Sequence, residues 1–162
     1  MPRLCLDCYR IFSDEMRVPA SYYRPPQCPL LECSGELIGV DENMLPVVIT
    51  LNKKGYQTHG SCSTHLWSDE GYVQAYVKFK PEHCPGDDLF DTCETIPLPS
   101  GFELVHAPDG NVIRSHRCGG SRLPRKLKYS ERQMLVFNYL QTLLRWAEDL
   151  PKRKKGSEKQ CT

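Results

Sequence analysis

The sequence predicts an α+β fold for residues 39–150, with a small, mainly antiparallel sheet and a helix at its C-terminal end. Residues 72–79 alternate between apolar and polar side chains, which is the pattern of a half-buried strand. Residues 102–106 and 111–116 flank the sequence Ala107-Pro108-Asp109-Gly110, whose residue types favour the turn of a β-hairpin. These segments supply the strands of the predicted sheet.

A short helix is expected before these strands, over residues 44–55. Residues 41–43 offer side chains that can cap it, Pro46 is tolerated in a first turn, and Gly55 is a preferred residue just beyond a helix end. The β-branched run at residues 47–50 is also compatible with a strand.

The C-terminal helix is expected to begin at a capping box, Ser130-Glu131-Arg132-Gln133, and to end near Asp149, before Pro151. Apolar residues recur at helical spacing along it. They are Met134, Phe137, Leu140, Leu144 and Ala147.

Composition excludes several classes of protein. The net charge of the 162-residue chain is only +1, so no global field points to nucleic acid or to a membrane. Nine cysteines form an odd number, and the sequence shows neither a hydrophobic signal segment nor an apolar run of membrane-spanning length. We therefore expect a cytoplasmic protein with reduced or metal-bound thiols, rather than a secreted disulfide protein with one spare thiol.

Four cysteines in the first forty residues have the spacing of a metal site. Cys5 and Cys8 form a C-x2-C pair, Cys28 and Cys33 form a C-x4-C pair, and 19 residues separate the pairs. Four thiolates at such spacing can close a tetrahedral site, which predicts a structural Zn²⁺. Free or redox-active cysteines are the alternative.

This layout resembles the zinc ribbon family, and residues 34–37 resemble the end of a ribbon knuckle. The second pair departs from the commoner x2 spacing. The resemblance implies a zinc ribbon over residues 1–38. The rest of the sequence predicts the α+β domain of residues 39–150 and, from the basic run after Pro151, a disordered tail over 151–162.

The stretch from Gly55 to His65 concentrates chemically active side chains, with His59, Cys62 and His65 in an H-x2-C-x2-H pattern. Three interpretations stay open. The stretch could bind a second metal, Cys62 could be a nucleophile with a histidine as its base, or both residue types could be structural.

The sequence favours a fourth interpretation, recognition of a phosphate-bearing ligand. Hydroxyls and a flexible glycine in this stretch would combine with the arginine-rich segment from Arg114 to Arg122, and Tyr56, Tyr72 and Tyr76 could add a stacking face. We expect the two segments to lie side by side. The candidate ligand-binding residues are Tyr56, His59, Ser61, Cys62, Ser63, His65, Arg114, His116, Arg117 and Arg122.

Residues 51–58, followed by Ser61-Cys62-Ser63-Thr64-His65, resemble a motif of small, mostly uncharacterised phage and bacterial proteins, in which a helix leads into a Ser-Cys-Ser-Gly-His turn behind a zinc ribbon. Ser61-Cys62-Ser63 is also similar to a stretch of the wybutosine-synthesising tRNA methyltransferase family. Thr64 replaces the glycine of both patterns, and His65 replaces an arginine of the second. Both resemblances imply a turn that faces a nucleotide-like or RNA-like ligand.

The leading functional hypothesis is a zinc-containing, non-enzymatic binding protein that holds a nucleotide or a nucleic-acid segment. A phage-encoded accessory or anti-defence protein acting on a host protein in the host cytoplasm would suit this design. The alternatives are an enzyme acting on RNA or a nucleotide through Cys62 and His65, and a zinc-ribbon adaptor for protein interactions. A homo-oligomer is compatible with each of them.

Overall fold

The computed structural model describes residues 1–13, 26–64, 72–80, 97–116, 118–119 and 127–153. Several predictions fall outside these residues. They concern His65, Arg117 and Arg122, and most of the predicted tail.

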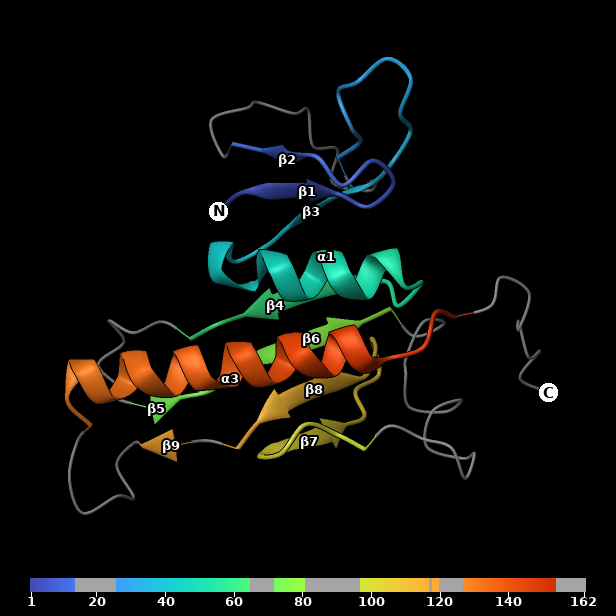
Figure 1. The fold of residues 1–162 in the computed structure, drawn as a ribbon. Coiled ribbons are helices and arrows are strands. Elements are labelled where there is room, and N and C mark those ends of the chain that lie inside the picture. Colours follow the sequence, from blue (N-terminus) through green and yellow to red (C-terminus); the bar gives the residue numbers. More distant parts are fainter. Residues whose placement is uncertain (14–25, 65–71, 81–96, 117, 120–126, 154–162) are drawn as a thin grey trace.

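The N-terminal part is a three-stranded antiparallel sheet with the strand order β2-β1-β3. Its strands are β1 (Arg3–Cys5), β2 (Ile11–Phe12) and β3 (Leu37–Gly39). Strand β3 crosses the predicted domain boundary at residue 38 and leads directly into the first helix (Figure 1).

The central sheet has four antiparallel strands in the order β4-β6-β8-β7. The strands are β4 (Thr58–Cys62), β6 (Tyr76–Phe79), β7 (Phe102–Val105) and β8 (Val112–Ser115). The predicted hairpin is confirmed as β7 and β8. The predicted strand at 72–79 is divided, because β5 (Tyr72–Val73) leaves the main sheet and pairs with β9 (Cys118–Gly119).

The helical interpretation of residues 44–55 is confirmed by a single turn, η1 (Glu42–Met44), that continues into α1 (Leu45–Lys53). The Asp41 carboxylate accepts a hydrogen bond from the Asn43 backbone N–H at 3.1 Å, as a capping side chain does. Gly55 follows the helix with φ +92°, a conformation that glycine adopts without steric cost. The capping residue and the glycine beyond the helix end thus outweigh the strand preference of the β-branched run at residues 47–50.

The C-terminal helix α3 (Tyr129–Asp149) is also confirmed, although its cap differs from the prediction. The residue before its first turn is Lys128 rather than Ser130. Its backbone N–H donates to the Glu131 carboxylate at 2.7 Å. This bond satisfies a donor that a helix start otherwise leaves without a partner.

The apolar stripe predicted on α3 is only partly right. Ala147 is buried and Leu140 and Leu144 are partly buried, but Met134 and Phe137 are 67% and 60% exposed. The side chains that face the sheet follow a second stripe of similar spacing. They are Val136, Leu143, Trp146, Ala147 and Leu150.

Both helices pack on the same face of the central sheet, so one continuous core contains residues of α1, α3 and the strands (Figure 1). The inward positions Val73, Ala75, Val77 and Phe79 are all fully buried, as their alternation predicts. Leu4, Leu6, Ile38 and Val40 from the N-terminal sheet belong to the same core. No helix within the described ranges is long and apolar enough to cross a membrane.

The end of α3 is fastened to the end of α1. The Lys54 ammonium donates to the backbone carbonyls of Glu148 and Leu150, the latter at 2.6 Å. The Tyr56 hydroxyl donates to the carbonyl of Pro151 at 3.1 Å, and the Arg153 N–H donates to the Lys54 carbonyl at 2.8 Å. A cation at the C-terminal end of a helix also interacts favourably with the helix dipole.

The hairpin turn gives a test of the fold. Gly110 has φ +129°, and a Cβ atom there would lie 2.1 Å from the Phe79 carbonyl oxygen. Gly110→Ala should therefore lower the free energy of unfolding in urea by about 3 kcal/mol. The matched control is Gly101→Ala, where φ is +79° and no atom lies within 4 Å of the added carbon. That variant should lose only about 1 kcal/mol. Equal losses would contradict the close approach at Gly110.

Candidate functional site

The four N-terminal cysteines come together, and this part of the prediction is confirmed. All four Sγ atoms lie within 4.8 Å of one another. The Cys5 and Cys33 sulfurs are 3.5 Å apart, and those of Cys8 and Cys28 are 3.9 Å apart. A tetrahedral site with metal–sulfur bonds of about 2.3 Å has sulfur–sulfur distances of about 3.8 Å. The cluster therefore could hold a metal ion.

Backbone hydrogen bonds in two turns position these thiols. In the first turn the Cys5 N–H donates to the Arg10 carbonyl at 3.0 Å, and the Tyr9 N–H donates to the Cys5 carbonyl at 3.1 Å. In the second turn the Cys33 N–H donates to the Leu30 carbonyl at 3.0 Å. That bond tightens the longer x4 spacing enough for both sulfurs to reach one point.

The thiols of the cluster differ in their pKa because their surroundings differ. Burial raises the pKa of the Cys5 thiol to about 12, because a thiolate in this position loses its hydration. Backbone N–H donation, chiefly from Arg10, instead lowers the pKa of Cys8. A bound cation would compensate the buried negative charge, and four thiolates would leave no open position for a substrate. The centre therefore fits a structural metal better than a catalytic one.

Gly35 lies against this centre, where a Cβ atom would come 2.6 Å from the Cys5 sulfur and 2.8 Å from the Asp7 Cβ. Its carbonyl also accepts from the Cys28 N–H at 2.8 Å. Glycine is thus required by space at this position, a role that the cysteine spacing does not reveal.

A second group of side chains lies on the face of the central sheet that α1 and α3 do not cover. In the strand register Cys62 pairs with Tyr76, Tyr76 with Arg114, and Arg114 with Glu103. Directly paired residues share one face, and their Cβ atoms are about 5 Å apart. Cys62 and Arg114 therefore flank the Tyr76 ring in one row across four strands.

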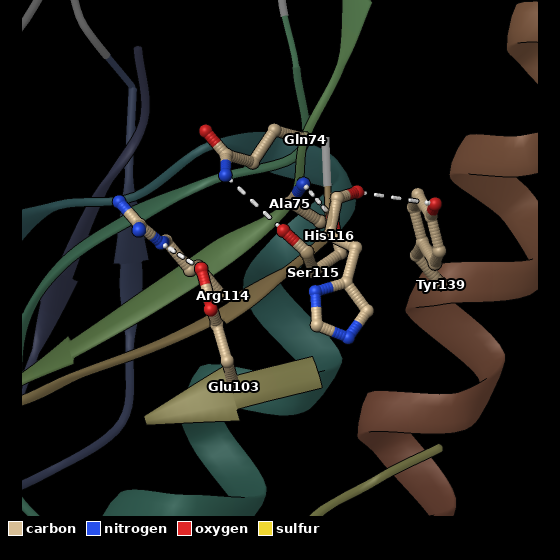
Figure 2. Close-up of polar contacts among 7 residues, drawn as sticks. All are labelled: Gln74, Ala75, Glu103, Arg114, Ser115, His116 and Tyr139. Atoms are coloured by element: carbon tan, nitrogen blue, oxygen red, sulfur yellow. Dashed lines mark hydrogen bonds and ion pairs between the residues drawn. The ribbon is translucent and has the colours of Figure 1, made fainter. Parts of the chain in front are cut away.

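Arg114 is paired with an acid in this row. Its Nε donates to a Glu103 carboxylate oxygen at 2.7 Å, and both side chains are 41% exposed. Figure 2 shows the pair pointing away from α3. A half-exposed pair of this kind contributes about 0–1 kcal/mol, so Arg114 can change partner at little cost.

His59 occupies the start of the same face, where a register shift between Thr58 and Gly60 gives β4 an extra residue. Burial and the nearby Lys78 ammonium lower the pKa of His59. Lys78 also pairs with Asp109 and lowers the pKa of that carboxyl. His59 is thus kept neutral beside an ion pair.

The serine hydroxyls of the Gly55 to His65 stretch point into the fold and not toward the outer face of the central sheet. Ser63 is buried, and both its N–H and its Oγ donate to the Asp41 carboxylate, at 3.0 and 2.7 Å. Ser61 pairs with Val77 on the core side, and its buried Oγ has no hydrogen-bond partner among the described residues.

Thr64 adopts φ +91°, a strained conformation for a β-branched residue. Its Oγ1 compensates by donating to the Gln74 carbonyl and accepting from the Gln74 N–H, at 2.7 and 2.8 Å. The glycine that Thr64 replaces in the resembling motifs would take this backbone conformation without strain.

The turn that follows β8 is fixed by its neighbours (Figure 2). The Gln74 side-chain amide donates to the Ser115 carbonyl at 3.1 Å, and the Ser115 Oγ accepts from the Ala75 N–H at 3.0 Å. The Tyr139 hydroxyl donates to the His116 carbonyl at 3.4 Å. The His116 residue itself is exposed.

The candidate ligand-binding residues therefore do not all lie on one face of the protein. Cys62 and Arg114 share the outer face with His59 and the added Tyr76, whereas Ser61 and Ser63 point elsewhere. Tyr56 is only 4% exposed and belongs to the core. Sequence reasoning missed Glu103, although an acid opposite a basic residue on a neighbouring strand is a signal that could have indicated it. It identified Asp41 only as a helix-capping residue, and not as the partner of Ser63.

Cys62 does not have the environment of an activated nucleophile. Burial raises the pKa of its thiol, and within the described part of the chain the only lowering contribution is the Thr64 N–H, 3.3 Å from its sulfur. A thiol with a raised pKa is largely protonated near neutral pH and is a weak nucleophile.

No family model, curated protein or solved structure matches this chain. A function is therefore inferred from the geometry of the cysteine cluster and of the side chains on the outer face of the central sheet.

Gly35→Ala should lower the affinity for metal at least tenfold, because the added methyl group displaces the Cys5 sulfur. Elemental analysis of the purified protein and competition with a chelator measure the effect. Gly39→Ala is the control, since its Cβ would meet only the flexible end of Met1 at 3.3 Å. Equal metal content in both variants would contradict the steric role of Gly35.

The lowered pKa of His59 predicts a pH dependence. The folded state resists protonating this ring, whereas the unfolded chain protonates it below a pKa of about 6.5. Its contribution to stability is thus complete above that value and decreases as the pH falls toward the folded pKa.

His59→Gln should therefore lose less stability than the wild type between about pH 7 and pH 5 in urea titrations. The pKa of Asp109 is already lowered below its ordinary value by Lys78, so this carboxyl stays ionised between pH 7 and pH 5 in both proteins and the difference reports on His59. Parallel pH profiles would show that His59 is not held neutral.

Proposed function

We propose that this chain is a zinc-dependent, non-enzymatic binding protein that holds a phosphate-bearing ligand, a nucleotide or a nucleic-acid segment, on the outer face of its central sheet. Residues 1–38 act as a zinc ribbon in this proposal. The carrying observation is the row in which Cys62, Tyr76 and Arg114 face the same side on adjacent strands.

The choice of zinc rests on the chemistry of the donors. Four cysteine sulfurs with nearly tetrahedral spacing suit Zn²⁺, whereas magnesium, calcium and manganese prefer oxygen ligands. Copper(I) and iron–sulfur clusters also accept thiolates. Elemental analysis that finds one of these metals in place of zinc would contradict this part of the proposal.

The ligand class rests on two adjacent side chains. The ring of Tyr76 can stack on a nucleobase, and the guanidinium of Arg114 can donate two hydrogen bonds to a phosphate. Both are partly exposed, so a ligand can reach them without opening the core.

The basic side chains on the outer face of the central sheet already have acidic partners, so a bound phosphate would have to replace a carboxylate. Arg114 pairs with Glu103, Lys78 with Asp109, and Lys80 with Glu36. A phosphate would therefore displace Glu103 from Arg114. Because that pair is weak, the cost is about 1 kcal/mol or less, which corresponds to about fivefold in affinity.

The absence of activation at Cys62 supports binding without catalysis, as does the closed set of four thiolates. The accessory role in a phage-infected host is implied by the sequence resemblance alone and stays a prediction.

Two substitutions should change binding in opposite directions. Arg114→Ala should weaken binding more than tenfold, since it removes a charge-assisted hydrogen bond. Glu103→Gln should strengthen binding up to about fivefold, because it frees the guanidinium. Fluorescence anisotropy with a labelled single-stranded oligonucleotide, and separately with a labelled nucleoside triphosphate, measures both changes.

The charge-matched controls are Arg145→Ala and Glu148→Gln on the exposed face of α3, and both should leave affinity unchanged at constant salt. The salt dependence of oligonucleotide binding should also become shallower by about one unit in Arg114→Ala. Weaker binding in Glu103→Gln, or no binding of either probe by the wild type, would overturn the proposal.

A further inference from the structure

Helix α3 carries an outer stripe of side chains that begins on its exposed face and ends at Leu144, which is partly buried at the edge of the core. Met134, Phe137, Gln141 and Leu144 follow one another at alternating intervals of three and four residues. This is the spacing of the a and d positions of a coiled-coil heptad. Val136, Leu143 and Trp146 already hold the helix against the sheet, so the outer stripe is not needed for that contact.

The outer stripe is exposed and uncharged in its first half. Met134 and Phe137 are 67% and 60% exposed, among the largest values for apolar residues in the described chain. The exposed helix positions from 130 to 141 all lack a charge, although charged residues make up 25% of the protein. They are Ser130, Gln133, Met134, Phe137, Asn138 and Gln141.

A neutral face of this kind is suited to a copy of itself. A two-fold interface brings the same patch of both subunits together, so like charges within the patch would meet and repel. A partner with a charged surface would instead select complementary charges on this face. The exposed positions from 130 to 141 provide none, and the partly buried Glu131 and Arg132 carry opposite charges.

An antiparallel pair of α3 helices has a register that pairs the residues of the outer stripe with one another. Met134 of one copy then faces Leu144 of the other, and Phe137 faces Gln141. At the ends Ser130 faces Glu148 and Gln133 faces Arg145, so no two like charges meet. A single polar residue in such a seam fixes the register at some cost in stability, which is the role of Gln141 here.

We propose that the outer face of α3 forms a two-fold, antiparallel dimer interface with a second copy of this chain. Phe137 is its central residue, and the contact leaves the outer face of the central sheet open in both copies. The interface is independent of the metal ligands and of Arg114.

The dimer is tested on the full-length, metal-loaded protein by sedimentation velocity over a concentration series. The wild type should show a monomer–dimer equilibrium, because a short helical seam lies at the weak end of protein interfaces. Phe137→Glu and Gln141→Lys should each be monomeric, since each would bury an unpaired charge. Circular dichroism confirms that each variant keeps its helix content.

Mixing the variants tests the register. In an equimolar mixture of Phe137→Glu and Gln141→Lys, the new acid faces the new base, and dimers should reappear. A mixture of Phe137→Glu with Met134→Lys should stay monomeric, because Met134 faces Leu144. A monomeric wild type, a dimeric Phe137→Glu, or rescue in the second mixture as well as the first would overturn the proposal.

Discussion

The apolar contact between the N-terminal sheet and helix α1 is the interaction on which the rest of the structure depends. Leu4, Leu6, Ile38 and Val40 pack in the same core as Met44 and Val48, all of them almost inaccessible to solvent. The Lys80–Glu36 ion pair adds a polar link between the N-terminal part and the central sheet. Because the four cysteines hold the turns of that sheet in place, a metal ion there would stabilise the central domain as well as its own surroundings.

Local chemistry made much of the fold predictable. The alternation at residues 72–79, the Asp109-Gly110 turn and the boundaries of α1 depend on neighbours in the sequence, and the structure confirms them. The buried side of helix α3 was harder to predict, because its two apolar stripes have the same period. Periodicity establishes that a helix has an apolar side, but only tertiary packing decides which of two stripes faces the sheet.

The candidate site was less predictable for a related reason. The cysteine cluster could be identified because its spacing is itself the signal, whereas the orientation of the Gly55 to His65 stretch depends on strand register. A single extra residue at His59 reverses the alternation, so Ser61 faces the core and Cys62 the outer side. Neither this register shift nor the position of Arg114, two strands away from Cys62, can be inferred from the sequence.

The attachment of the α3 end to α1 has a practical consequence for work on this protein. A Cβ atom at Gly55 would lie only 3.1 Å from the Arg153 Cβ, so the described chain ends beside the entry to strand β4. An affinity tag or fluorophore joined shortly after residue 153 would therefore start beside the junction between α1 and β4. A label at Asp149, which is exposed near the same helix end, would also sit close to this junction. A label near Leu31, which is fully exposed on the cysteine-bearing turn, would keep clear of it.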